Sequence, residues 1–174
     1  LVISVMAGVP LRALPPCTIR ALPNAAAELR QSYTPWFASP DCSAADRALA
    51  ETILSAIGTC EALADEDQLD LMTATSGAGP AYSALMARAV IGFLVENGLP
   101  PATAHRAAEA MICGAAPLMA GKMAEVDALV QLFIDYKGTT AAGLQTAMDQ
   151  GFETALQKGL AAATARAKAM ADGL

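Results

Sequence analysis

Two short segments of the sequence combine residue types that suit the binding of a small anion. One is Ser76-Gly77-Ala78-Gly79-Pro80, directly before an apolar stretch, and the other is Lys137-Gly138-Thr139-Thr140. Glycine lets backbone approach a ligand closely, and the N–H groups at a helix N-terminus favour anions. The second segment adds hydroxyls and the positive end of a helix dipole, which suit a carboxylate. Each segment alone has a structural alternative, because glycine-rich turns before helices are common.

Residues for several other chemistries are missing. The cysteines Cys17, Cys42, Cys60 and Cys113 have neither metal-ligand spacing nor a C-x-x-C pair, so no metal site is expected. They are interpreted as reduced thiols of a cytoplasmic protein. The single histidine, His105, lies in a polar stretch that predicts a surface position. The sequence contains no P-loop and no Ser-His-Asp set.

Composition limits the partners of this chain. A net charge of −6 argues against nucleic acid. Hydrophobic residues make up 55% and charged residues 16%, which predicts surface buried against another subunit. No membrane span is expected, because no stretch of about 18 residues stays apolar. The chain opens on a strand-like run without Met or preceding basic residues, so we expect a fragment and no signal peptide.

Before residue 66 the pattern is that of a β-rich piece with one helix, typical of the trailing edge of a larger α/β domain. Asp41 or Ser43 is expected to cap the helix. Pro35 predicts an edge strand or a bulge. The predicted strands are 1–7, 18–22, 33–38 and 59–63, and the predicted helix is 44–57.

After residue 66 the pattern is helical. Helices are predicted from Pro80 to Glu96, from Pro101 towards Pro117, over 125–135, and from Thr139 or Thr140 to about Met170. The first of these is apolar nearly all round, so a second subunit is expected to cover it. The last carries small residues every four positions, which indicate close approach of another backbone unless they reflect drift in composition: Gly143, Ala147, Gly151, Ala155 and Gly159.

Taken together, in this order and spacing, these segments resemble the pyrroline-5-carboxylate reductase family. The resemblance covers nearly the whole chain, and its most specific part is SGAGPAY (76–82) followed at the right distance by GTTAAGL (138–144). Further matching segments are ISVMAGV (3–9), Leu22-Pro23-Asn24, Leu69-Asp70 and Gly98-Leu99-Pro100.

The resemblance implies an α/β tail followed by an all-α region. Residues 1–66 would be the end of a dinucleotide-binding Rossmann domain, and residues 67–174 a helical dimerisation and substrate domain of the 6-phosphogluconate dehydrogenase C-terminal-like type. It also implies a homodimer or higher homo-oligomer. The implied reaction reduces a cyclic imine to proline, or reduces a related imino acid, with hydride from NADP or NAD in the reduced form.

Site residues follow from the resemblance by position. Ala7 and Gly8 would lie beside the nicotinamide, with Pro23 and Asn24 in the neighbouring turn. Glu66 matches an acidic position near the bound product, and the substrate-binding set also includes Ser76, Gly77 and Gly79.

At the second segment, Gly138 and Thr139 would offer N–H groups to the carboxylate. Thr140, the catalytic candidate, would hydrogen-bond the ring nitrogen or the carboxylate.

The sequence departs from the family pattern on ligand-facing segments. Tyr136 and Lys137 stand where the family has Pro and Gly, and Arg88 stands at an acidic position. We expect Arg88 to pair with Glu109, in the same or the partner subunit, unless it reaches solvent or a carboxylate ligand. The glycine-rich dinucleotide fingerprint is absent, so this chain alone is expected to bind NAD(P)H poorly and to be inactive.

Two other functions fit the same pattern. One is a catalytically impaired member of the family that acts as a dimerising module. The other is a β-hydroxyacid-type dehydrogenase, which relies on a catalytic lysine in its helical domain. Lys122 is the only lysine between Glu66 and Asp135, and it lies in a predicted loop.

Overall fold

A four-stranded mixed sheet forms the centre of the first part of the chain. In the computed structural model, which describes residues 1–173, the strands are β1 (Val2–Ser4), β2 (Thr18–Ala21), β3 (Ser32–Ala38) and β4 (Gly58–Ala62), in that order across the sheet. The β1–β2 and β3–β4 pairs are parallel, whereas β2 and β3 are antiparallel. The strand predicted over 1–7 is wrong in length, because only three residues of β1 pair with β2 before the chain turns at Gly8.

The chain divides into two compact units. The first comprises Leu1–Ala81 together with the chain from Lys158 onward, and the second is Tyr82–Gln157. The α/β part followed by helices agrees with the predicted fold class. The domain boundary at 66/67 remains a prediction, and each unit is described separately below.

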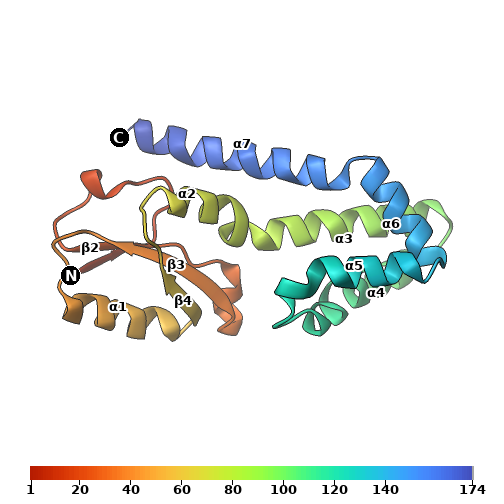
Figure 1. The fold of residues 1–174 in the computed structure, drawn as a ribbon, viewed down its shortest axis with the longest axis horizontal. Helices are drawn as coiled ribbons and strands as arrows, with labels where there is room; N and C mark the ends of the chain where they lie inside the picture. The colour runs from red at the N-terminus through yellow and green to blue at the C-terminus, as the bar shows by residue number, and fades with distance from the viewer. Residues whose placement is uncertain (174) are drawn as a thin grey trace. The chain divides into compact units, whose positions relative to one another are not determined.

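Helix α1 (Ala44–Ser55) covers one face of the sheet (Figure 1). Ser43 caps this helix in a capping box with Asp46, which decides between the two predicted caps. The helix buries Ala50 and Leu54 against alternating residues of β2 and β3, which point to the same face because side chains alternate along a strand. The resulting core cluster is Ile19, Ala21, Trp36, Ala38, Cys42, Ala50 and Leu54.

Pro35 is not at an edge, contrary to the expectation. It lies in β3, which pairs with both β2 and β4. The carbonyl of Pro35 accepts a hydrogen bond from the N–H of Leu22 at 3.0 Å, so its missing N–H faces the residue just after the end of β2. The sheet therefore tolerates this proline, because its missing N–H lies beyond the last residue of β2 that pairs with β3.

The β3–β4 pair carries a titratable contact. The Tyr33 hydroxyl donates to Glu61 Oε2 at 2.5 Å, and this bond to the carboxylate raises the pKa of Tyr33 from 10 to about 12. A raised pKa means that the folded state holds this proton more tightly, so its contribution to stability is complete below pH 10 and is lost as pH rises to about 12. Spectrophotometric titration of tyrosinate should show this, and Glu61→Gln should move the pKa back towards 10.

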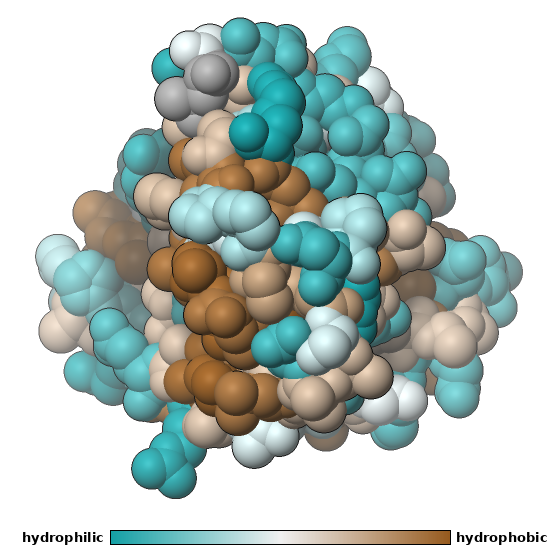
Figure 2. Space-filling view, turned by 90° about the vertical axis from the view of Figure 1, so that its left-hand side faces the viewer, coloured by the Kyte–Doolittle hydropathy of each residue, from teal (hydrophilic) through white to brown (hydrophobic). Residues whose placement is uncertain are grey.

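β1 is an edge strand, and apolar residues in it and on either side of it are exposed. Leu1, Val2, Val5 and Met6 are 45%, 41%, 58% and 50% exposed. The N-terminus lies on the left-hand side of Figure 1. Figure 2 views the molecule from that side and shows a hydrophobic band on it. Exposed apolar sheet edges of this kind are suited to pairing with another strand.

The opposite face of the sheet carries α2 (Gln68–Met72), which buries Leu69 and Asp70. A π-helical turn, Thr73–Gly77, follows, and then α3 (Gly79–Glu96). The run Gln68–Glu96 is thus helical throughout. By length and composition alone, it is the one helix in the described chain that could cross a membrane. No span is expected from the sequence, because Gly and Pro interrupt the apolar run.

The second unit consists of helical segments. They are the rest of α3, α4 (Pro101–Glu109), a π-helical turn Ala110–Gly114, 3₁₀ turns at Ala116–Leu118 and Met123–Glu125, α5 (Val126–Asp135) and α6 (Thr139–Asp149). The chain then enters α7 (Phe152–Asp172), so the single long helix predicted from Thr139 or Thr140 is wrong. Gly151, at φ +80°, lies between α6 and α7, so the stripe of small residues is divided between two helices.

This unit has almost no hydrophobic core of its own. Among the described residues its buried hydrophobic side chains are all alanine (Ala104, Ala108 and Ala141), and α3 buries none of its residues. Large apolar side chains are exposed instead: Leu85, Met86, Phe93, Val95, Met111, Leu118, Leu132, Phe133, Met148 and Phe152. Exposed apolar surface of this extent is typical of an interaction site.

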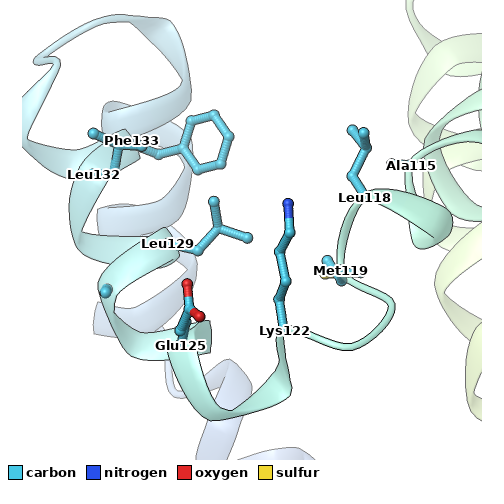
Figure 3. A pocket seen from close by; sticks show the side chains of 9 residues that line it. Ala115, Leu118, Met119, Lys122, Glu125, Leu129, Leu132 and Phe133 are labelled. Atoms are coloured by element: carbon cyan, nitrogen blue, oxygen red, sulfur yellow. The ribbon is translucent and has the colours of Figure 1, made fainter.

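An apolar cavity of about 470 Å³ lies in the same unit. Figure 3 shows the Lys122 ammonium among Leu118, Leu129 and Phe133, with Glu125 nearby. Lys122 precedes the Met123–Glu125 turn, so it lies in a loop as predicted.

Candidate functional site

Four of the predicted site residues meet at one edge of the sheet. Ala7 and Gly8 follow β1, and Pro23 and Asn24 follow β2. Because β1 and β2 are parallel, both segments leave the sheet at its carboxyl edge, where α/β sheets bind their ligands. Ala7 is exposed, whereas Gly8 is buried.

Gly8 is buried because α7 lies against it. Its φ is +69°, and a Cβ placed there would come within 2.8 Å of Met170 Cβ. Both the left-handed backbone and the close approach require glycine at this position. The backbone of the loop after β1 is therefore held against α7.

Asn24 connects the two predicted ligand segments of the first unit. Its Oδ1 accepts from the N–H of Ala26 at 2.9 Å, and its Nδ2 donates to the carbonyl of Ser76 at 2.9 Å. Its backbone N–H donates to Ser32 Oγ at 3.1 Å. Asn24 thus holds the turn after β2 against the segment that contains Ser76.

The Ser76–Pro80 segment is not a turn before a helix. Thr73–Gly77 is a π-helical turn within the continuous run from α2 to α3, so its N–H groups do not form the expected helix N-terminus. Ser76 Oγ donates to the carbonyl of Met72 at 3.3 Å. A Cβ on Gly77 would lie 3.3 Å from the same carbonyl, whereas Gly79 has open space around it. A π-turn inside a helix is frequent at functional sites.

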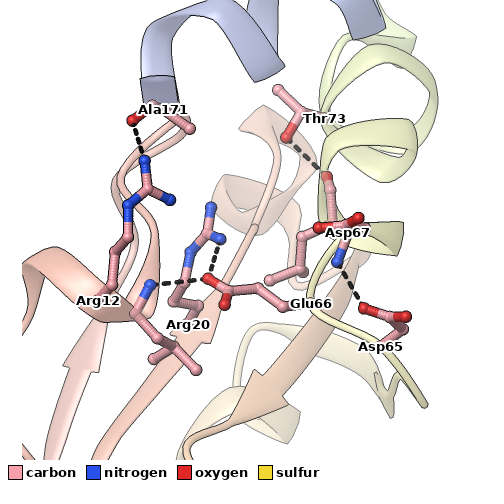
Figure 4. A network of polar contacts seen from close by, with 9 residues as sticks. Arg12, Arg20, Asp65, Glu66, Asp67, Thr73 and Ala171 are labelled. Carbon is pink, nitrogen blue, oxygen red and sulfur yellow. Dashed lines mark hydrogen bonds and ion pairs between the residues drawn. The ribbon is translucent and has the colours of Figure 1, made fainter. Parts of the chain in front are cut away.

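Glu66 forms an ion pair that the sequence did not predict. Its Oε1 lies 2.5 Å from Nη1 of Arg20, and it also accepts from the N–H of Leu11 at 2.7 Å. Figure 4 shows this arrangement together with the bond from Arg12 to the carbonyl of Ala171, at 2.7 Å. The side chain of Arg20 is only 4% exposed.

Arg20 was missed because a single Arg between apolar residues of a strand reads as a solvent-facing position. A signal was nevertheless present. Arg20 stands within an apolar strand, between Ile19 and Ala21, and the acidic run 65–67 later in the chain could supply a carboxylate partner. A buried arginine requires a carboxylate partner.

A polar cavity of about 230 Å³ adjoins this ion pair. Arg12, Arg20 and Lys168 line it together with Glu66, Asp67, Asp70 and Asp172. Burial raises the pKa of Asp70, and the charges of Arg20 and Lys168 partly oppose that shift. All of these residues belong to the first unit.

The remaining predicted residues lie at the start of α6, in the second unit. Gly138 is the N-cap, with no side-chain capping bond, so the expected cap by Thr139 or Thr140 is wrong. The first intrahelical bond runs from the N–H of Ala142 to the carbonyl of Gly138, so the N–H groups of 139–141 precede the helical ladder. Thr139 and Thr140 are exposed, and Lys137 has φ +55°.

The predicted Arg88–Glu109 pair does not form within one chain. Both residues are exposed, and the ion pair of the described residues is Arg20–Glu66. A pair with the partner subunit remains a prediction. His105 is exposed, as expected.

The chain matches known proteins along its whole length. The family model for pyrroline-5-carboxylate reductase dimerisation matches residues 66–170. The pyrroline-5-carboxylate reductase of Pseudomonas aeruginosa is 34% identical over 100% of this chain and 66% of its own length. That of Synechocystis sp. is 32% identical over 97% of this chain and 64% of its own length. The chain thus spans just under two thirds of these curated relatives.

Solved structures agree with these matches. A pyrroline-5-carboxylate reductase from Coxiella burnetii superposes with a TM-score of 0.86, at 29% identity over 97% of this chain and 64% of its own. The Plasmodium falciparum pyrroline carboxylate reductase, solved with NADP bound, has the same fold with a TM-score of 0.87. It is 23% identical over 98% of this chain and 71% of its own.

Proposed function

Because the chain belongs to the pyrroline-5-carboxylate reductase family, we propose that it serves in the NAD(P)H-dependent reduction of 1-pyrroline-5-carboxylate, or of a related cyclic imino acid. The observation that carries this proposal is the family match over residues 66–170, which contains the α6 segment Gly138–Thr140. The reduction adds hydride to the C=N carbon and a proton, from solvent, to the ring nitrogen, which becomes an amine.

The residues at the carboxyl edge of β1 and β2 fit a nicotinamide. Ala7 is exposed and has the smallest chiral side chain, which leaves room for a flat ring beside it. Gly8 and Asn24 hold the two loops through the contacts with Met170 and Ser76. The reduced cofactor, NADPH or NADH, would supply the hydride when bound at Ala7, Gly8, Pro23 and Asn24. The phosphate-binding glycine loop is not among the described residues, so these residues would hold only the nicotinamide end.

The start of α6 fits the carboxylate of the substrate. The N–H groups of Gly138 and Thr139, with the helix dipole behind them, favour a negative charge. The exposed hydroxyl of Thr140 is available for the ring nitrogen or for a carboxylate oxygen. Together these contacts would orient the imine for hydride transfer, which is the main contribution of the protein to such a reaction.

Steady-state kinetics with the intact protein test this function. We expect consumption of reduced cofactor that depends on 1-pyrroline-5-carboxylate, with either NADPH or NADH. If neither cofactor is oxidised with any cyclic imine, the protein is the non-catalytic dimerising module instead. The dehydrogenase alternative is the weaker one, because Lys122 lies in a loop and the family match is to pyrroline-5-carboxylate reductases.

Cofactor affinity of this chain by itself is a separate expectation. Without the phosphate-binding loop, titration followed by nicotinamide fluorescence should show no saturation at micromolar cofactor. Micromolar affinity would mean that the cofactor site is misplaced.

The partner of this chain is, we propose, a second copy that covers the helical unit. The only buried hydrophobic side chains of that unit are three alanines, while large apolar residues such as Phe93, 64% exposed, face outward on α3. This surface lies within the matched dimerisation region, residues 66–170. The same partner would bury the apolar run that otherwise has the length of a membrane span.

Sedimentation measures this association directly. We expect a dimer or larger oligomer at micromolar concentration, and Phe93→Glu should raise the dissociation constant by a hundredfold or more. The reason is that an uncompensated charge in an interface costs roughly 3–5 kcal/mol. Leu49→Glu, on the exposed side of α1 at 52% exposure, is the matched control and should leave the sedimentation unchanged. A well-folded monomer of the unaltered chain would contradict the proposal.

A further inference from the structure

The loop between β1 and the 3₁₀ turn Leu11–Ala13 is held at two points. At the first, the backbone of Gly8 lies against Met170 of α7. At the second, the N–H of Leu11 donates to Glu66 Oε1 at 2.7 Å. This loop carries Ala7 and Gly8, so these two contacts set where that pair of residues lies.

The second contact is rigid because of Arg20. One oxygen of Glu66, Oε1, accepts both from the N–H of Leu11 and from Nη1 of Arg20. Arg20 belongs to β2, all four residues of which are buried between β1 and β3. The oxygen that holds the loop is therefore fixed by a central strand of the sheet, and not by a flexible surface side chain.

Charge keeps Glu66 in this position. Nε and Nη2 of Arg20 are buried without a hydrogen-bond partner among the described residues, so Glu66 is the single ion-pair partner of a guanidinium that is 4% exposed. If Glu66 turned towards a substrate, the buried guanidinium would lose its one ion-pair partner among the described residues, and only the charge of Asp70, which forms no ion pair with it, would remain nearby. Loss of the partner of a buried charge is strongly unfavourable. Direct contact with substrate and the ion pair with Arg20 thus compete, and the geometry favours the ion pair.

We propose that Arg20 and Glu66 are positioning residues: they fix the Val5–Pro10 loop through the Leu11 N–H and thereby place Ala7 and Gly8 against the nicotinamide. This role rests on the proposed imine reduction and replaces the direct substrate contact predicted for Glu66. The pair acts on the reaction through the loop, without touching the substrate.

Hydrogen exchange tests the structural half of this proposal independently of catalysis. In Glu66→Ala, the Leu11 amide should exchange at least tenfold faster, because it loses its acceptor. In Glu66→Gln, the amide oxygen still accepts, and exchange should stay within about threefold of the unaltered protein. Glu61→Ala is the matched control: it removes a carboxylate that also accepts a 2.5 Å bond, from Tyr33, and should leave Leu11 unchanged.

Kinetics of the intact protein test the functional half. Glu66→Ala should lower kcat for imine reduction at least tenfold, because a displacement of about 1 Å at the reacting centre has effects of up to a hundredfold. KM for the imino acid should stay within about threefold. The primary isotope effect with cofactor deuterated at the transferred position should rise, because hydride transfer becomes slower than the other steps.

Substitution of Glu66 alone leaves Arg20 unpaired and could unfold the protein. The double variant Arg20→Met with Glu66→Ala removes both charges and should fold while retaining the fast Leu11 exchange. The proposal is overturned if Leu11 exchange does not change in either variant. It is also overturned if Glu66→Ala raises KM while kcat and the isotope effect stay constant. If the unaltered protein does not reduce the imine but Leu11 exchange changes in the variants as expected, the proposed reduction is contradicted. Only the contact between Glu66 and the loop is then established.

Discussion

Thr140→Ala is expected to lower imine reduction by more than tenfold with little loss of stability. Thr140 is exposed at the first turn of α6, whose N-cap is Gly138, so its hydroxyl is not needed to cap the helix. A hydrogen bond to a charged group contributes roughly 1.5–3 kcal/mol, which corresponds to about ten- to more than a hundredfold in rate. Steady-state kinetics and the melting temperature of the intact protein measure the two effects.

Two further variants make this result specific. Thr140→Val keeps the shape of the side chain without its hydroxyl and should resemble Thr140→Ala. Thr146→Ala is the matched control, because Thr146 is exposed on the same helix and its hydroxyl donates to the carbonyl of Ala142 at 2.9 Å. It should retain full activity.

Lys137 complicates the measurement, since its ammonium could hold the carboxylate and hide part of the loss. The double variant Lys137→Gly with Thr140→Ala should therefore be assayed alongside. Glycine also suits the φ of +55° at this position better than lysine does. If Thr140→Ala leaves turnover intact and only lowers the melting temperature, the threonine is structural and the proposed substrate contact is wrong.

Gly58→Ala is expected to destabilise the first unit by at least about 3 kcal/mol. Gly58 begins β4 opposite Ser32 and has φ +146°. A Cβ there would lie 2.1 Å from the carbonyl oxygen and 2.5 Å from the nitrogen of Ser32. Both atoms are backbone of a central strand and cannot yield, so strained backbone and overpacking add together.

Denaturant unfolding followed through Trp36, which is 4% exposed in the sheet core, measures this loss. Gly173→Ala is the matched control, because a Cβ there meets its nearest atom at 3.8 Å, which is ordinary contact. The control should lie within about 0.5 kcal/mol of the unaltered chain. A Gly58→Ala variant of unchanged stability would show that the β3–β4 pairing differs from the one described.

Local patterns predicted the elements well wherever one helix or strand determines its own ends. Ser43 with Asp46 marks the start of α1, and Asn97-Gly98 marks the end of α3. The predictions were wrong where the conformation of a segment depends on the strand or helix next to it. Pro35 is accommodated inside the sheet because β2 ends opposite it, and Ser76–Gly79 is helical because α2 and α3 join through a π-turn.

For the candidate site, the sequence by itself determined the family and the residues that match its motifs, since SGAGPAY and GTTAAGL are local and specific. Only the tertiary structure decided what those residues touch. Glu66 meets Arg20, 46 positions away, and Asn24 meets Ser76, 52 positions away. Such partners are set by strand order and by which face of the sheet each side chain takes, and a local pattern does not contain that information.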